Sequence, residues 1–180
     1  MPTVIERPFG EIGEFPARQF ELSNAQGMVA RVTEYGATLT HLWVPDSQGH
    51  PGDVVLGFDS LDEYSSHRWY FGATVGRVAN RIKNGRFKLG NQTYHLNVND
   101  GSNHLHGGKT GWDKRLWRTR EAEVVSTEAT DVARVIFSYV SSDGEEGYPG
   151  QGALVEGIIS GRTPFVQQSR LHLAEKVFEN

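Results

Sequence analysis

Short alternating runs of polar and apolar residues, separated by turn residues, dominate the first 150 positions of the chain. Such β-type runs occupy residues 18–22, 28–32, 38–44 and 53–58. Gly36 interrupts the chain before the third run, and residues 45–49, which begin with Pro45, are expected to form a loop after it. The regular spacing of the turns and the content of β-branched and aromatic residues predict an all-β sandwich or barrel.

The clearest hairpin joins residues 85–89 to residues 92–96 through the two-residue turn Gly90-Asn91, a pair that supplies the positive φ values of such a turn. Two further strands are expected at residues 116–125 and 133–140, with a polar loop at residues 126–128 between them. Before residue 70, helix is predicted only at residues 60–64. Ser60 is its expected N-cap and Glu63 follows three residues later, as in a capping box.

The last thirty residues depart from this rhythm. Residues 151–157 do not supply the alternating strand expected next, and residues 171–178 have the pattern of a short amphipathic helix. The chain is therefore expected to divide into a β domain over residues 1–150 and a divergent tail over residues 151–180.

Composition limits the class of protein. The 180 residues are 37% hydrophobic and 22% charged, which is ordinary for one globular domain, and the net charge of -4 argues against nucleic acid or an anionic membrane as a partner. The sequence has no cysteine, which excludes disulfides and thiolate metal sites, and no apolar run of about 20 residues that would cross a bilayer. A cytoplasmic location is expected, and the oligomeric state is left open.

Two arginines and an amide lie close together in the segment Gly76-Arg77-Val78-Ala79-Asn80-Arg81-Ile82. A guanidinium is a permanently charged fork of donors, suited to gripping sugar hydroxyls or orienting a carboxylate. On residue type alone, surface salt bridges are the competing interpretation of these arginines.

Two histidines flank Leu105 in the segment Asn103-His104-Leu105-His106-Gly107-Gly108. At i and i+2 on a strand they are expected to point the same way, and an imidazole there can donate to a sugar oxygen or exchange protons near pH 7. Metal ligation by His104 and His106 lacks a third group of ligands nearby, so no metal is predicted. Structural histidines in a glycine-rich turn remain the alternative.

Three carboxylates fall within nine residues in the segment Ser142-Asp143-Gly144-Glu145-Glu146-Gly147-Tyr148-Pro149-Gly150. They suggest Ca²⁺ binding or paired acid–base work. The segment lacks the alternating oxygen-ligand spacing of an EF-hand loop, which favours a tight acidic turn.

Taken together, the motifs resemble those of the galactose mutarotase (aldose 1-epimerase) family in order and spacing over residues 8–150. The resemblance rests on five segments: Tyr70-Phe71-Gly72 with residues 76–82, the hairpin of residues 85–96, residues 103–108, Gly111-Trp112-Asp113-Lys114 with Leu116-Trp117, and residues 142–150. It implies a large antiparallel β-sandwich with an open sugar-binding groove and no cofactor.

By this resemblance Asn80 and Arg81 hold a monosaccharide such as galactose or glucose. His106 is the catalytic candidate, donating toward the ring oxygen or a neighbouring hydroxyl. The reaction of the family exchanges anomers. A carboxylate takes the C1 hydroxyl proton, a histidine protonates the ring oxygen, and the opened aldehyde turns about C1–C2 before it closes again.

The family's acid histidine follows the Tyr-Pro-Gly turn after further strands, and its base glutamate lies near the end of a longer chain. Neither context is matched here, and His172, Glu175 and Glu179 are assigned no role. A truncated sandwich without its catalytic half is therefore expected. A non-catalytic sugar-binding or regulatory protein is the alternative function. A phosphosugar epimerase, which would use the cations Arg77, Arg81, Lys109 and Lys114, is the third.

Overall fold

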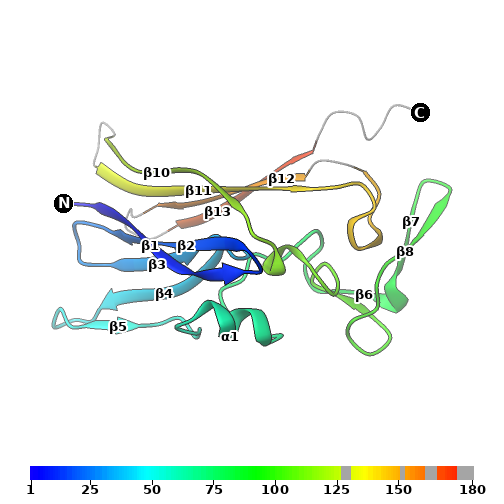
Figure 1. The fold of residues 1–180 in the computed structure, drawn as a ribbon, viewed down its shortest axis with the longest axis horizontal. Helices are drawn as coiled ribbons and strands as arrows, with labels where there is room; N and C mark the ends of the chain where they lie inside the picture. Colours follow the sequence, from blue (N-terminus) through cyan, green and yellow to red (C-terminus); the bar gives the residue numbers. More distant parts are fainter. Residues whose placement is uncertain (127–130, 151–152, 161–165, 174–180) are drawn as a thin grey trace.

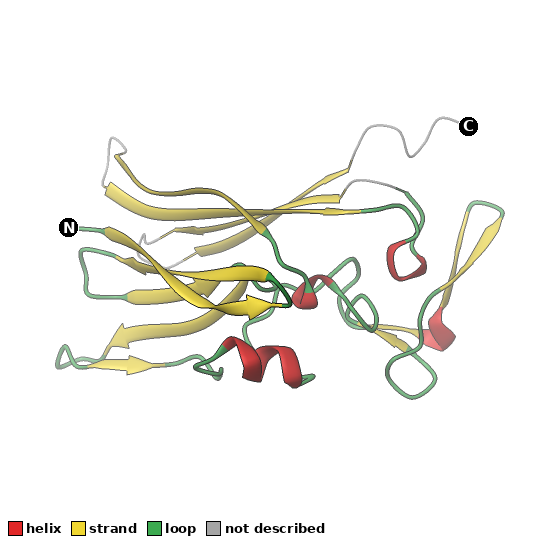
Figure 2. Ribbon diagram, viewed as in Figure 1, coloured by secondary structure: helices red, strands yellow, loops and turns green. Residues whose placement is uncertain are grey.

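A computed structural model of the chain describes residues 1–126, 131–150, 153–160 and 166–173. Antiparallel strands make up most of it, as the yellow arrows of Figure 2 show. The first sheet is a simple meander in the order β1-β2-β3-β4-β5. Its strands are β1 (Thr3–Ile12), β2 (Phe15–Ser23), β3 (Val29–Thr33), β4 (Thr38–Pro45) and β5 (Pro51–Asp53).

The second sheet has the order β10-β11-β12-β13 and lies over the first as a separate layer (Figure 1). Its strands are β10 (Arg118–Ser126), β11 (Asp131–Ser141), β12 (Ala153–Ser160) and β13 (Val166–Leu173). All its pairings are antiparallel. The two layers confirm the predicted β-sandwich.

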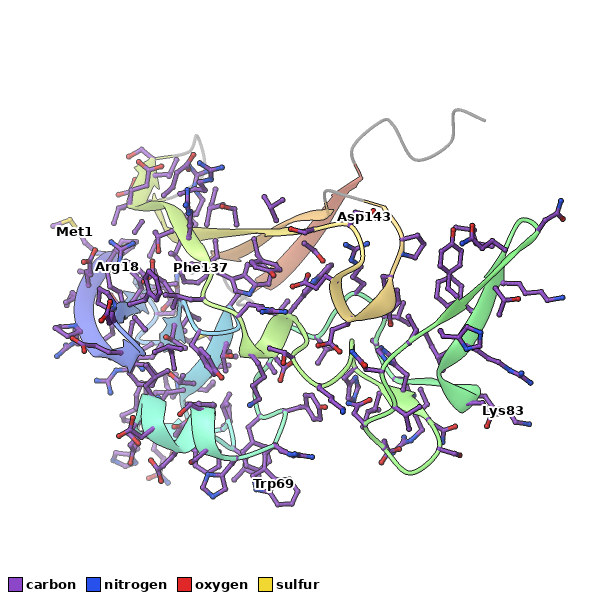
Figure 3. All side chains as sticks on the ribbon, turned by 45° about the vertical axis from the view of Figure 1, so that its right-hand side comes forward. Met1, Arg18, Trp69, Lys83, Phe137 and Asp143 are labelled. Atoms are coloured by element: carbon purple, nitrogen blue, oxygen red, sulfur yellow. The ribbon has the colours of Figure 1, made fainter. Side chains whose placement is uncertain are left out.

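The core lies between the two sheets because their inward-facing residues are apolar. Phe20 of β2 and Phe137 of β11 are fully buried, and their ring centroids are 5.8 Å apart. Trp117, directly before the second sheet, is also buried and packs edge-on to Trp112 with ring centroids 6.4 Å apart. In Figure 3, Phe137 lies within this core, whereas Trp69, which is 60% exposed, lies at the outer edge of the molecule.

An excursion between the two sheets extends to one side of the sandwich, at the right of Figure 1. It contains two small antiparallel pairs. The first joins β6 (Arg81–Ile82) to β9 (His104–Leu105), and the second joins β7 (Arg86–Leu89) to β8 (Gln92–His95). This excursion carries most of the candidate site residues.

The hairpin and the short helix are confirmed. β7 and β8 meet at the pair Leu89↔Gln92, so Gly90 and Asn91 form the turn. Only Gly90 of the two has positive φ (59°), as in a type II′ turn.

The helix is α1 (Leu61–Ser66), and the Ser60 side chain accepts a hydrogen bond from the Glu63 backbone N–H. Short 3₁₀ turns cover Lys83–Gly85, Trp112–Lys114 and Glu145–Gly147. No helix in the described part of the chain has the length and hydrophobicity to cross a membrane.

The strand predicted at residues 53–58 is wrong, because β5 ends at Asp53. The Asp53 carboxylate accepts from the N–H groups of Leu42 and Val55, and the Phe58 N–H donates to the Tyr64 hydroxyl of α1. Side chains therefore satisfy N–H groups that a longer strand would have paired in a ladder. In contrast, Thr3–Ile12 is a strand that was not predicted from the sequence.

The expectation that residues 151–157 supply no strand is also wrong. β12 pairs with β11 along its whole length, in the register Phe137↔Gly157. Repeated β-branched residues, Val155, Ile158 and Ile159, favour a strand although Gly157 interrupts the alternation. Leu171 to Leu173, expected to be helical, belong to β13, and the remainder of that predicted helix lies outside the described residues. The boundary proposed at residue 150 stays a prediction.

Candidate functional site

The β6–β9 pair brings Asn80, Arg81 and His106 together from positions about 25 residues apart. Arg81 pairs with Leu105, and Ile82 pairs with His104. Asn80 therefore precedes one strand and His106 follows the other at the same end of the pair. All three side chains are exposed or half-buried.

Asn80 and His106 exchange two hydrogen bonds. The His106 backbone N–H donates to the Asn80 carbonyl at 3.1 Å, and the Asn80 backbone N–H donates to Nδ1 of the His106 ring at 3.0 Å. An Nδ1 that accepts a hydrogen bond carries no proton, so the neutral ring bears its proton on Nε2. The site thus presents His106 as a donor through Nε2.

The electrostatic surroundings favour the neutral form of this imidazole. Burial, and then the nearby Arg81 guanidinium, lower the pKa of His106 from its ordinary value of 6.5. Tyr70 packs against the imidazole with ring centroids 4.6 Å apart, and burial followed by the charges of Asp113 and Asp100 raises the pKa of its hydroxyl. Tyr70 keeps its proton and supplies an aromatic wall to His106.

Arg81 projects at the surface beside this pair. Its Nε donates to Asp100 at 2.6 Å, in a salt bridge whose side chains are 54% and 37% exposed. The surface salt bridge anticipated for an arginine of this segment is therefore present at Arg81. The Asp100 carboxylate engages Nε of the guanidinium, which carries two further nitrogens.

His104 does not share the environment of His106, so the expectation that both rings point the same way is wrong. His106 has left the strand with φ at 49°, whereas His104 remains in β9 and is fully buried. Nδ1–H of His104 donates to the Asn97 carbonyl at 2.7 Å, and Nε2 accepts from the Tyr148 hydroxyl at 2.7 Å. His104 is a structural histidine. In the described residues no group of three or more His, Asp or Glu side chains is arranged to hold a metal.

Arg77 is a structural clamp and not part of the exposed site. Its guanidinium donates to four carbonyl oxygens at the ends of the acidic turn, those of Ser141, Ser142, Pro149 and Gly150, and to the Ser141 hydroxyl. Among the described residues Arg77 forms no salt bridge, and its guanidinium N–H groups are directed at the turn. Lys114 is similarly engaged, with Nζ donating to the carbonyls of Tyr64 and His67.

Two of the three carboxylates of residues 142–150, Asp143 and Glu145, hold the turn in place through hydrogen bonds and an ion pair. Asp143 accepts from the Gly150 N–H, and Glu145 accepts from the hydroxyls of Tyr139 and Ser141 and pairs with Arg115 at 2.9 Å. The structural interpretation of this cluster as a tight acidic turn is confirmed. Glu146 is different, because it reaches outside the turn.

Two residues for which the sequence predicts no contact with this segment, Asn99 and Glu146, hold the loop after His106. The Asn99 side chain accepts from the Leu105 N–H and donates to the carbonyls of Leu105 and Gly108. The Glu146 carboxylate accepts from the N–H groups of Lys109 and Thr110, each at 3.0 Å. Glu146 is 36 residues from Thr110 in sequence, so no local pattern could have indicated this contact.

A groove of about 560 Å³ borders the site but does not include its three candidate residues. Tyr70 lines it together with Arg68, Lys109 and Asp113. Asn80, Arg81 and His106 are not among the residues that line this groove, and their side chains are exposed or half-buried.

The protein is thus an all-β sandwich of two antiparallel sheets, with Asn80, Arg81 and His106 on a lateral excursion between them. The family model described as "Aldose 1-epimerase" matches residues 18–155. The chain therefore belongs to the aldose 1-epimerase family.

Individual relatives agree with this assignment. Galactose mutarotase from Bos taurus is 46% identical over 153 residues, which cover 84% of this chain and 42% of that protein. Aldose 1-epimerase from Escherichia coli (strain K12) is 37% identical over 142 residues, 78% of this chain and 39% of that protein. The crystal structure of galactose 1-epimerase from Lactobacillus acidophilus NCFM superposes with a TM-score of 0.74 at 30% identity and covers 89% of this chain and 45% of that one. The chain spans less than half the length of the curated relatives it matches.

Proposed function

We propose that this chain forms the sugar-binding part of an aldose 1-epimerase that interconverts the α and β anomers of hexoses such as galactose and glucose. Asn80 and Arg81 hold the sugar, and His106 donates a hydrogen bond through Nε2 to the ring oxygen or to a hydroxyl beside it. The observation that carries the proposal is the Asn80 N–H to His106 Nδ1 hydrogen bond of 3.0 Å. It joins Asn80 to His106 and fixes the tautomer that donates outward, and Nη1 of Arg81 donates to the Asn80 side-chain oxygen at 3.5 Å.

A neutral His106 suits transition-state stabilisation. When the C1–O5 bond of the hexose breaks, its electron pair moves to O5, and a donor aimed at that oxygen stabilises the developing negative charge. The proton that O5 gains comes from a separate acid, and the proton of the C1 hydroxyl goes to a base. The aldehyde then rotates about C1–C2 and closes in the other configuration. No residue of this chain is assigned to that acid or that base.

The cations near the site favour a neutral sugar over a phosphosugar. Arg77 and Lys114 are committed to backbone carbonyls. The charge of Arg81 is balanced by Asp100, so its guanidinium can donate to sugar hydroxyls but offers no net charge to a phosphate. Of the four cations considered for a phosphate, this leaves Lys109, which has no side-chain partner in the described structure. A phosphosugar epimerase is therefore the least supported function.

A sugar-binding protein without turnover is the second candidate. It is favoured by one observation, namely that the Asn80–His106 hydrogen bond builds a donor group to which no acid or base of this chain is assigned. The two candidates share the binding site and differ only in the presence of an acid and a base.

Polarimetry and calorimetry test the shared binding site, and a catalysed rate is the outcome that separates the two candidates. We expect the 180-residue chain to leave the spontaneous mutarotation of α-D-galactose at the buffer rate while binding galactose in a calorimetric titration. A rate well above the buffer blank, reduced roughly 100-fold or more by His106→Ala, as for a lost transition-state donor, would establish a complete enzyme. A catalysed rate that survives His106→Ala would place the site elsewhere.

A further inference from the structure

The segment after His106 is held in a conformation that its own backbone does not favour. His106, Gly107 and Gly108 are three consecutive residues with positive φ, at 49°, 90° and 110°. For a residue with a side chain this region is costly, and it persists only where the surroundings impose it. Two glycines in a row also give the loop a large conformational entropy to lose. Something outside the loop must therefore fix it.

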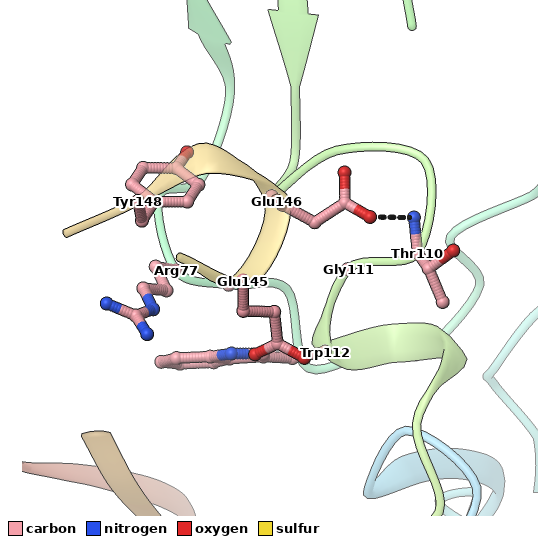
Figure 4. A pocket seen from close by; sticks show the side chains of 9 residues that line it. Arg77, Thr110, Gly111, Trp112, Glu145, Glu146 and Tyr148 are labelled. Carbon is pink, nitrogen blue, oxygen red and sulfur yellow. Dashed lines mark hydrogen bonds between the residues drawn. The ribbon is translucent and has the colours of Figure 1, made fainter. Parts of the chain in front are cut away.

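The Glu146 carboxylate provides that contact from the acidic turn (Figure 4). One oxygen, Oε1, accepts from the Thr110 N–H at 3.0 Å. The other, Oε2, accepts from the Lys109 N–H at 3.0 Å and from the Asn97 side-chain amide at 2.8 Å. Hydrogen bonds to an ionised acceptor are about twice as strong as neutral ones, so this contact is suited to hold a strained loop.

The two glycines are required by the same packing. A Cβ on Gly108 would lie 2.1 Å from Oε2 of Glu146, and a Cβ on Gly107 would lie 1.5 Å from the Gly76 carbonyl oxygen. The Gly107-Gly108 pair thus lets the loop close onto both the acidic turn and the segment that leads to Asn80. Glu146 itself has φ at 51°, so left-handed residues lie on both sides of this packing, Glu146 in the acidic turn and His106 to Gly108 in the loop.

We propose that Glu146 is a positioning residue for His106. By fixing the N–H groups of Lys109 and Thr110, it holds the loop so that the His106 ring stays on the Asn80 N–H and against Tyr70. Asn99 fixes the loop at Leu105 and Gly108, and Glu146 fixes the residues that follow, Lys109 and Thr110. The consequence for sugar binding rests on the proposed function, whereas the placement of the ring does not.

The test compares Glu146→Ala with Asp143→Ala in the 180-residue chain. Both variants remove one carboxylate from the same turn, but within the described residues Asp143 accepts from the Gly150 N–H and from no group of the loop. The His106 ring signals and the Asn80 amide signal are followed by NMR, with His106→Ala used to assign the ring. Glu146→Ala is expected to shift or broaden both sets of signals, and Asp143→Ala to leave them in place. Unchanged His106 and Asn80 signals in a folded Glu146→Ala protein would overturn the proposal.

Glu146→Gln gives a graded version of the same test. It keeps one carbonyl oxygen as an acceptor at the same chain length, so the His106 and Asn80 signals should move in the same direction but less far. If Glu146→Ala does not fold, the glutamine variant decides the matter, and an undisturbed ring in that variant contradicts the proposal.

Galactose affinity adds a second readout. Glu146→Ala should raise the galactose dissociation constant about tenfold while Asp143→Ala leaves it unchanged. If the wild-type chain binds no galactose but the His106 ring still responds to Glu146→Ala, the proposed function fails and the positioning role stands. If galactose binds and the ring does not respond, the positioning role fails alone.

Discussion

At the scale of single residues, the tautomer of His106 connects its protonation to the fold. The Asn80 N–H donates to Nδ1, so protonating that nitrogen breaks the contact. Burial and Arg81 lower the pKa of His106 below 6.5, which means that the folded protein binds this proton more weakly than the unfolded chain. The stability contributed by the neutral ring is fully present above pH 6.5 and is lost as the pH falls below it.

A pH series of urea unfolding tests this linkage. Between about pH 7 and about pH 5 the wild-type chain should lose more unfolding free energy than His106→Gln, which has no titratable ring. Above pH 7 the unfolding free energies of the two proteins should change with pH in parallel. Parallel losses in the two proteins would show that the pKa of His106 is not depressed by folding.

At the scale of elements, the buried pair of His104 and Tyr148 ties β9 to the acidic turn. The Tyr148 hydroxyl donates to Nε2 of a fully buried ring. Tyr148→Phe removes that donor without creating a cavity and leaves the nitrogen unsatisfied, which should lower the unfolding free energy by about 1–3 kcal/mol. Tyr94→Phe in β8 is the control, because the Tyr94 hydroxyl has no hydrogen bond in the described structure. Equal stability of the two variants would mean that the His104 contact contributes nothing.

Pairing of β12 with β11 can be tested by hydrogen exchange. If β12 is paired in the register Phe137↔Gly157, the β11 amides that point toward β12 should exchange as slowly as those that point toward β10. Fast exchange confined to the β12-facing set would show that β11 is an edge strand in solution. That outcome would restore the sequence-based expectation that the sandwich pattern ends near residue 150.

These elements also show what the sequence could predict. Sequence patterns were sufficient to predict structures that neighbouring residues form among themselves, as in the Gly90-Asn91 hairpin and the Ser60 cap of α1. They failed at residues 53–58, where N–H groups are satisfied by the Asp53 carboxylate and the Tyr64 hydroxyl, because such bonds leave no trace in the alternation of residues.

The sequence predicted the candidate site only in part. Asn80, Arg81 and His106 were predicted through the family motifs, yet their contact depends on the β6–β9 pairing of strands of two residues each, too short to show a period. The role of Glu146 depends on a contact across 36 residues. It becomes visible only when the acidic turn is placed beside the loop.

At the scale of the whole molecule, the two sheets form a scaffold and the lateral excursion presents the site. Arg77 connects the two by donating to the carbonyls at the ends of the acidic turn, and that turn holds the loop after His106. The orientation of His106 therefore depends on contacts between the second sheet and the excursion.

A calorimetric titration with galactose tests the central claim most directly. We expect the wild-type chain to bind galactose and His106→Ala to bind at least about tenfold more weakly, the cost of losing one hydrogen bond to the sugar. His95→Ala, which removes an exposed histidine with no side-chain partner in the described structure, should bind like the wild type. Absence of binding by the wild-type chain, or equal affinity of His106→Ala and the wild type, would contradict the account.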